Sequence, residues 1–100
     1  GDGDITVIDV SDSTNPVAGN SWKYSIVNAL EIKDNILYVA GGRANFEPRV
    51  QLYDLTDPLN PRQLEYPRNV HETIFEIKLT DNFMYLLTQN SIIVCTRPGR

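Results

Sequence analysis

The stretch Asp4-Ile-Thr-Val-Ile-Asp-Val-Ser-Asp-Ser-Thr-Asn-Pro16 returns later in the chain as Arg49-Val-Gln-Leu-Tyr-Asp-Leu-Thr-Asp-Pro-Leu-Asn-Pro61. Asp9 corresponds to Asp54, a displacement of 54 − 9 = 45 residues. Both copies place an apolar-rich run, β-branched in the first copy, before a cluster of turn-forming residues, which is typical of a strand followed by a turn. This internal repeat decides the architecture that the sequence predicts. The other shared polar positions are Asp12, Asn15 and Pro16, which recur as Asp57, Asn60 and Pro61.

A second repeated phrase supports the first. Lys33-Asp-Asn-Ile-Leu-Tyr-Val39 returns as Thr80-Asp-Asn-Phe-Met-Tyr-Leu86, a displacement of 85 − 38 = 47 residues. The two displacements differ because the connecting loops differ in length, which a surface connection tolerates. A unit of about 45 residues made of short strands and turns is typical of a β-propeller blade. The sequence therefore predicts an all-β chain of four-stranded antiparallel blades that form an incomplete ring.

The predicted strands divide the chain into three blades. Residues 1–26 form the end of one blade, 27–66 a full blade and 67–100 most of a third. A propeller closes with about four to eight such blades, so 100 residues are too few to close one. We expect the sequence to be a fragment, with neighbouring blades completing the propeller; copies of the chain or partner chains are the alternative.

Three local features of the predicted strands can be compared with a structure. The strand from Val27 to Lys33 is apolar on both faces, which predicts cover on both sides. The strand from His71 to Leu79 aligns Phe75 and Ile77 with Leu79 on one face. Asp81-Asn82 repeats Asp34-Asn35, so we expect the same two-residue hairpin turn in both copies.

The two Asp-bearing phrases resemble the LVIVD repeat of bacterial and archaeal propeller proteins, and the resemblance covers nearly the whole chain. Ser13 replaces a Pro that the second copy keeps as Pro58. In the third copy, the sequence predicts that Cys95 stands where Asp9 and Asp54 stood. The resemblance implies a surface or secreted protein, in an extracellular, periplasmic or cell-surface location, whose propeller serves binding.

Charge and composition exclude several classes of partner. The net charge is −4 and the calculated pI is about 4.8. Because no basic stripe is present, a nucleic-acid partner is not expected. No apolar run reaches the length of a membrane span, and no motif predicts a cofactor or a metal. Cys95 lies in an apolar run, which favours a buried small side chain over a reactive thiol.

The candidate site residues fall into two groups. Asp9, Asp54, Asp12 and Asp57 are predicted to hold turns, with carboxylates that accept hydrogen bonds from nearby backbone N–H groups. The alternative, an acid–base pair of Asp9 and Asp54, is disfavoured because the repeat puts them on different blades. The candidate ligand-binding residues are His71, at the head of an inner strand, and Trp22 and Phe46, which lie near loops. Exposed-loop or packing roles are the alternatives for these three.

Two kinds of function remain open. The first is a non-catalytic binding or scaffold module that presents loops to a protein or a glycan. The alternative is part of a propeller enzyme, with His71 as the local candidate, or a structural subunit that completes a larger assembly. The sequence favours the first.

Overall fold

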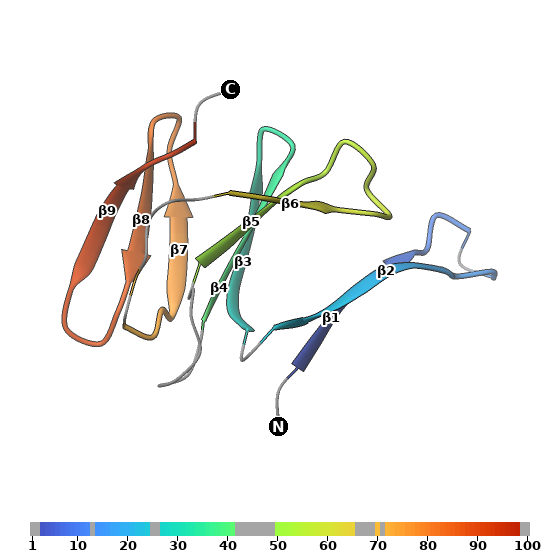
Figure 1. The fold of residues 1–100 in the computed structure, drawn as a ribbon, viewed down its shortest axis with the longest axis horizontal. Helices are drawn as coiled ribbons and strands as arrows, with labels where there is room; N and C mark the ends of the chain where they lie inside the picture. Colours follow the sequence, from blue (N-terminus) through green and yellow to red (C-terminus); the bar gives the residue numbers. More distant parts are fainter. Residues whose placement is uncertain are drawn as a thin grey trace.

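The computed structural model describes residues 3–12, 14–24, 27–41, 50–65, 70 and 72–98. Within these ranges the protein is all-β, with nine strands in three antiparallel sheets (Figure 1). The predicted all-β class is confirmed, and the described strands do not close into a ring. The part of the chain that the structure describes contains no helix long and apolar enough to cross a membrane.

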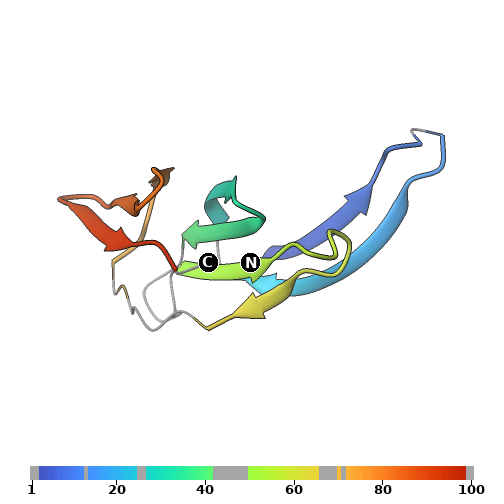
Figure 2. The same cartoon turned by 90° about the horizontal axis from the view of Figure 1, so that it is seen from above.

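Each sheet is a meander in which consecutive strands pair. Figure 1 shows the four-stranded sheet B (residues 27–64) in the middle, with the two-stranded sheet A (residues 3–24) on one side and the three-stranded sheet C (residues 76–96) on the other. Seen from above, the sheet A hairpin extends away from the other two sheets (Figure 2). Sheet A contains β1 (Gly3–Asp9) and β2 (Val17–Tyr24). Sheet B contains β3 (Val27–Lys33), β4 (Ile36–Gly41), β5 (Val50–Asp54) and β6 (Arg62–Leu64). Sheet C contains β7 (Glu76–Leu79), β8 (Phe83–Leu87) and β9 (Ile92–Thr96).

The main core lies between sheets B and C. Side chains alternate across a strand, so every second residue of β4 and β5 faces sheet C. Burying each large apolar side chain stabilises the fold by about 1.5–3 kcal/mol. The face of sheet B that meets sheet C, here the C-side face, presents Ile36, Tyr38, Ala40, Val50 and Leu52. The inner face of sheet C, which packs on it, presents Ile77, Leu79, Met84, Leu86, Ile93 and Cys95.

A smaller core lies on the opposite face of sheet B. Leu37, Val39 and Tyr53 are buried there, with Ile5 of sheet A and Leu55 packed against them. All six residues of β4 are consequently buried, because this strand is covered on both faces. β4 is the centre of the described fold.

Sheet A covers only part of sheet B. Leu30 and Ile32 of β3 are 51% and 63% exposed, so the predicted cover on both faces of this strand is wrong. The physical reason is that sheet A has two strands, and its Ile5 packs on residues of β4 and β5 rather than on β3.

A close approach between sheet A and the β5–β6 turn requires a glycine. A Cβ atom built on Gly19 of β2 would lie 2.3 Å from the carbonyl oxygen of Leu59, in the β5–β6 turn. Any side chain would therefore force the β2 strand away from that turn. Gly19 allows sheet A to approach sheet B closely at this point.

The two repeated hairpin turns differ in backbone. Asp34 and Asn35 have φ values of 53° and 66°, as a type I′ turn requires. Asp81-Asn82 also joins two antiparallel strands, β7 and β8, so the predicted two-residue hairpin turn is confirmed. Among the described non-glycine residues only Asp34 and Asn35 have positive φ, so the second turn has a different backbone conformation. There Thr80 closes the turn instead, with its N–H donating to the Phe83 oxygen at 2.9 Å and its Oγ1 accepting from the Phe83 N–H at 3.1 Å.

β7 is shorter than the sequence predicts, because it begins at Glu76. The Ile74 N–H donates to the Gly41 oxygen at 3.3 Å, and Asn28 Nδ2 donates to the Ile74 oxygen at 3.0 Å. These bonds tie the chain to sheet B just before β7. Ile74 is buried as a result, whereas Phe75 is 49% exposed and does not join Ile77 in the core as predicted.

Candidate functional site

The strand registers define which residues of sheets B and C are equivalent. In sheet B, Ile36 lies opposite Asp54, and in sheet C, Phe83 lies opposite Thr96. Thr96 therefore occupies the Asp54 position, and Cys95 occupies the position of Tyr53. The predicted alignment of Cys95 with Asp54 is wrong by one residue, because the β8–β9 connection is shorter than the β4–β5 connection. In a strand a one-residue shift exchanges the two faces.

With this register, the outer face of sheet C repeats the C-side face of sheet B. Four of its five apolar residues are among the exposed large hydrophobic side chains, with Ile92 65% and Val94 54% exposed. Tyr85 is half-buried. A contiguous apolar sheet face of this kind marks a surface that contacts something else. The apolar residues of the outer face are Phe83, Tyr85, Leu87, Ile92 and Val94, which point away from the core that contains Met84 and Leu86. Glu76, Lys78 and Thr96 lie on the same face.

The Asp-bearing turn after β5 is a second candidate. Asp54 Oδ1 accepts from the Thr56 N–H at 2.8 Å and from Thr56 Oγ1 at 2.7 Å. Its other oxygen accepts from Arg62 Nη2 at 2.9 Å. Asp57 accepts from the Leu59 N–H at 3.2 Å and from Asn60 Nδ2 at 3.1 Å. Both carboxylates thus hold the turn that leads into β6.

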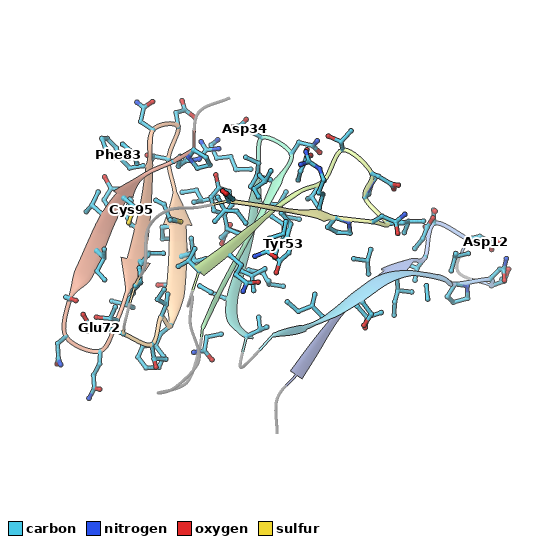
Figure 3. The ribbon with its side chains drawn as sticks, viewed as in Figure 1. Asp12, Asp34, Tyr53, Glu72, Phe83 and Cys95 are labelled. Carbon is cyan, nitrogen blue, oxygen red and sulfur yellow. The ribbon has the colours of Figure 1, made fainter. Side chains whose placement is uncertain are left out.

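The turn after β1 has the same local pattern without the arginine. Asp9 accepts from the N–H of Ser11 at 2.9 Å and from its hydroxyl. Asp12 accepts from the Thr14 N–H at 3.1 Å and from Thr14 Oγ1 at 2.7 Å. Val17 stands where the second copy has Arg62, 62 − 17 = 45 residues later. Figure 3 shows Asp12 at the far tip of the β1–β2 hairpin.

Hydrogen bonding lowers the pKa of three of these carboxyl groups. The Ser11 hydroxyl and then its N–H lower the pKa of Asp9, and those of Thr14 lower that of Asp12. The Thr56 hydroxyl and N–H lower the pKa of Asp54, with Arg62 contributing less. Since each donor favours the ionised form, these groups are acceptors for the turns rather than acids poised to release a proton near neutral pH.

A shallow depression of about 350 Å³ lies beside the second turn. It is lined by Asp54, Thr56, Asp57, Asn60 and Arg62. The polar groups that line it already bond to one another. In the described ranges, no three His, Cys, Asp or Glu side chains gather in a group that could hold a metal ion. The depression therefore has the character of a solvated turn surface.

A buried arginine joins sheets B and C at their hairpin ends. The Arg97 side chain is 4% exposed, and its Nη2 lies 2.8 Å from Asp34 Oδ2. Its Nε donates to the Tyr38 hydroxyl at 2.9 Å, and Nη1 donates to the carbonyl oxygens of Thr80 and Asp81, each at 2.9 Å. The Tyr38 bond and then Asp34 raise the pKa of Arg97 against the effect of its burial. Figure 3 shows Asp34 at the tip of the β3–β4 hairpin.

Sequence reasoning did not identify the Arg97 contacts. The Arg97 N–H donates to the Asn82 oxygen at 3.1 Å, just as the Leu55 N–H donates to the Asn35 oxygen at 3.0 Å. Position 97 is therefore the equivalent of position 55. An arginine in place of an apolar residue was the available signal, because a buried arginine is rarely without partners.

The structure does not bring the other predicted site residues together. His71 and Phe46 lie outside the described residues. Trp22 belongs to β2, where its Cα pairs with Ile5. Cys95 is 8% exposed in the core between sheets B and C, and its thiol is free of a disulfide. Asp9 and Asp54 lie in different sheets, so the structure does not pair them as acid and base.

Comparisons of the chain found no matching protein-family model, no matching curated protein and no matching solved structure.

Proposed function

We propose that the chain is a section of a β-propeller in which sheets B and C are neighbouring blades, and that the propeller serves as a non-catalytic binding scaffold. The observation that carries the proposal is the outer face of sheet C. Its residues occupy the same register positions as the C-side face of sheet B, which sheet C covers. An equivalent apolar face implies an equivalent cover, namely a further sheet of the same repeat.

The equivalence holds at each apolar position that β8 and β9 contribute to the face, whereas on β7 Glu76 stands where sheet B has Ala29. Phe83, Tyr85 and Leu87 correspond to Ile36, Tyr38 and Ala40, 47 residues earlier. On the next strand, Ile92 and Val94 correspond to Val50 and Leu52, 42 residues earlier, as the two registers require. All ten positions hold apolar or aromatic side chains. The five in sheet B are buried because sheet C lies on them, whereas the five in sheet C have no such cover among the described residues.

The opposite side of sheet B supports the same interpretation. Leu30 and Ile32 correspond to Ile77 and Leu79, 47 residues later. Ile77 and Leu79 pack in the core between sheets B and C, whereas Leu30 and Ile32 are exposed. Apolar residues of the stacking faces are thus uncovered on both sides of the sheet B–sheet C pair. Neighbouring blades, in the same chain or in partner chains, would cover them.

A stack of this kind leaves its turns and strand ends accessible for binding. The aspartates of the Asp-bearing turns are committed to local hydrogen bonds, which favours a binding role over a catalytic one. The ligand would be a protein or a glycan, with Trp22, Phe46 and His71 as candidate contacts. The LVIVD resemblance adds an extracellular, periplasmic or cell-surface location to the proposal.

The stacking is tested by adding one repeat to the chain. In the extended chain, a copy of residues 56–100 follows Arg97, which supplies a fourth strand to sheet C and a further sheet to cover its outer face. The matched variants are Phe83→Lys and its equivalent Ile36→Lys. In the original chain we expect a cost in unfolding free energy of about 3–5 kcal/mol for Ile36→Lys and under about 1 kcal/mol for Phe83→Lys.

In the extended chain the two costs should become similar, because Phe83 is then buried as Ile36 is. Urea unfolding followed by circular dichroism gives both values. A Phe83→Lys variant that is equally mild in the original and the extended chain would contradict the stacking.

The binding role is tested with the single tryptophan, Trp22. Its fluorescence is titrated with a panel of oligosaccharides and extended peptides, and a saturable change in emission identifies a ligand. We expect Trp22→Phe to weaken binding of that ligand, measured by calorimetry, by about tenfold, as for an aromatic contact at the centre of an interface. Unchanged affinity would remove Trp22 from the binding surface.

A further inference from the structure

β9 forms one edge of sheet C, whereas the equivalent strands β5 and β1 each have a neighbouring strand on that side. The strand order of sheet B places β6 beside β5, and sheet A places β2 beside β1. In sheet C the order ends at β9, so no strand of the described ranges pairs with its outer edge. Two of the three equivalent strands thus carry a neighbour that the third lacks.

The register shows which peptide groups of β9 face that edge. The Arg97 N–H donates to Asn82 and the Thr88 N–H donates to Ser91. These bonds flank Phe83/Thr96 and Leu87/Ile92, so both are non-hydrogen-bonded pairs, and Tyr85/Val94 between them is one as well. The N–H and C=O groups of Ile92 and Val94 therefore point away from β8. Those of Leu52, the equivalent of Val94, point towards β6, where Leu52 pairs with Leu64.

β9 also differs from the other edge strands in charge. The sheets have six edge strands, of which five carry at least one charged residue. Charged residues on edge strands oppose pairing with other chains. β9 reads Ile-Ile-Val-Cys-Thr and carries none, so it lacks this protection. The charged residues of the other five are Asp4 and Asp9 in β1, Lys23 in β2, Glu31 and Lys33 in β3, Arg62 in β6, and Glu76 and Lys78 in β7.

We propose that β9 pairs antiparallel with β9 of a second copy of this chain, with Val94 on the two-fold axis. β9 has five residues, and its middle residue faces the edge, so the strand can pair with itself in register. Val94 then exchanges two hydrogen bonds with Val94 of the second copy. Ile92 lies opposite Thr96 and Ile93 opposite Cys95, so no like charges meet. The two copies of sheet C become one continuous sheet.

This interface uses a different part of sheet C from the proposed stacking. It uses the edge of sheet C and its backbone groups, whereas stacking uses the outer face. A sheet packed on the outer face does not itself use the edge, whereas a fourth strand of sheet C, as in the extended chain above, would occupy it. Each proposal can therefore fail alone, and separate variants test each.

Sedimentation equilibrium of the 100-residue chain tests the edge pairing. We expect a monomer–dimer equilibrium that shifts with concentration. In Val94→Lys two like charges would lie opposite each other at the two-fold axis, and Val94→Glu would do the same. Each variant alone should dimerise at least about tenfold more weakly. Because Val94 is 54% exposed, both should fold, which circular dichroism checks.

An equimolar mixture of Val94→Lys and Val94→Glu should dimerise again, because the axis then joins opposite charges. Leu87→Lys is the matched control, since Leu87 is on the outer face of the central strand β8 and away from the edge. It should leave the dimer intact. Amide exchange at Ile92 and Val94 should slow as the dimer forms.

A chain that stays monomeric at every concentration would overturn the edge pairing. So would a dimer that persists in both Val94 variants, or one that Leu87→Lys disrupts, which would instead indicate docking through the outer face. Failure of the mixed variants to dimerise would overturn the placement of the axis at Val94.

Discussion

The C-side face of sheet B and the outer face of sheet C have the same pattern and opposite surroundings. Leu52 is fully buried and its equivalent Val94 is 54% exposed. The strands that carry them pair in the same register. The apolar pattern therefore belongs to the repeat, whereas burial depends on the neighbouring sheet. In a chain of stacked sheets, an apolar residue can be exposed because its cover lies beyond the described sheets, and not because its strand is irregular.

The largest expected effect distinguishes the two possible registers of β9. Cys95→Asp should lower the unfolding free energy by about 3–5 kcal/mol, because it buries a charge without a partner. Thr96→Asp should cost under about 1 kcal/mol, because Thr96 holds the position of Asp54, which carries an aspartate in the other sheet. Urea denaturation measures both. The reverse order would restore the alignment of Cys95 with Asp54.

A smaller effect separates the two faces directly. Leu52→Ala should cost about 2–5 kcal/mol, because the substitution leaves a cavity in the core between sheets B and C. Val94→Ala should cost under about 1 kcal/mol, chiefly through a lower preference for strand. Thermal and urea unfolding give both values. Equal costs would mean that the outer face of sheet C is already covered in solution, for instance by another molecule.

The sequence predicts the features of the fold that depend on residues close together in the chain better than those that depend on distant residues. The strands and the two Asp-bearing turns come from short phrases such as 4–16 and 49–61, which contain their own turn chemistry. The sequence could not predict that Cys95 is equivalent to Tyr53, because the third copy lacks the aspartate that fixes the alignment. The exposure of Leu30 and Ile32 could not be predicted either, because strand pattern does not report how many strands the neighbouring sheet has.

Arg97 shows the same limit for a polar contact. Its partners Asp34 and Tyr38 are 63 and 59 residues away in sequence. No local pattern brings them together. The contact exists because sheets B and C stack with their hairpin turns side by side, so it depends on the packing that the repeat implies but does not specify.

Arg97 also gives the third comparison, between a buried arginine and the exposed Arg62. Arg97→Met should cost about 2–4 kcal/mol, because it leaves buried partners of the guanidinium, above all the Tyr38 hydroxyl, without a donor. Arg62→Met is the control: the Arg62 side chain is 72% exposed, and its loss should leave the unfolding free energy nearly unchanged. A similar small effect for both variants would show that the Arg97 contacts do not hold sheets B and C together.

The smallest effect compares the two Asp-bearing turns. The pKa of Asp54 in the folded protein lies below its ordinary value of 3.8. Its contribution to stability is therefore fully present above that value and is lost as the pH falls through the lower folded pKa. Asp54→Asn should flatten the loss of stability below pH 4, measured by thermal unfolding at a series of pH values.

Asp9→Asn should act in the same direction, and its effect should be insensitive to salt because Asp9 lacks the Arg62 partner. Added salt should weaken the Asp54 contribution alone. Acid curves that neither substitution alters would mean that these turn hydrogen bonds do not contribute to stability.

The equivalence of sheets B and C is tested most directly by cross-strand proton contacts in solution. In a non-hydrogen-bonded antiparallel pair the two Cα atoms are closest, so nuclear Overhauser spectroscopy should connect the Hα atoms of Tyr38 with Leu52 and, in the same way, of Tyr85 with Val94. Contacts at both pairs would establish one register in the two sheets and place Ile92 and Val94 on the outer face. A contact of Tyr85 Hα with the Hα of Ile93 or Cys95 instead would shift β9 by one residue, exchange its faces and contradict the equivalence.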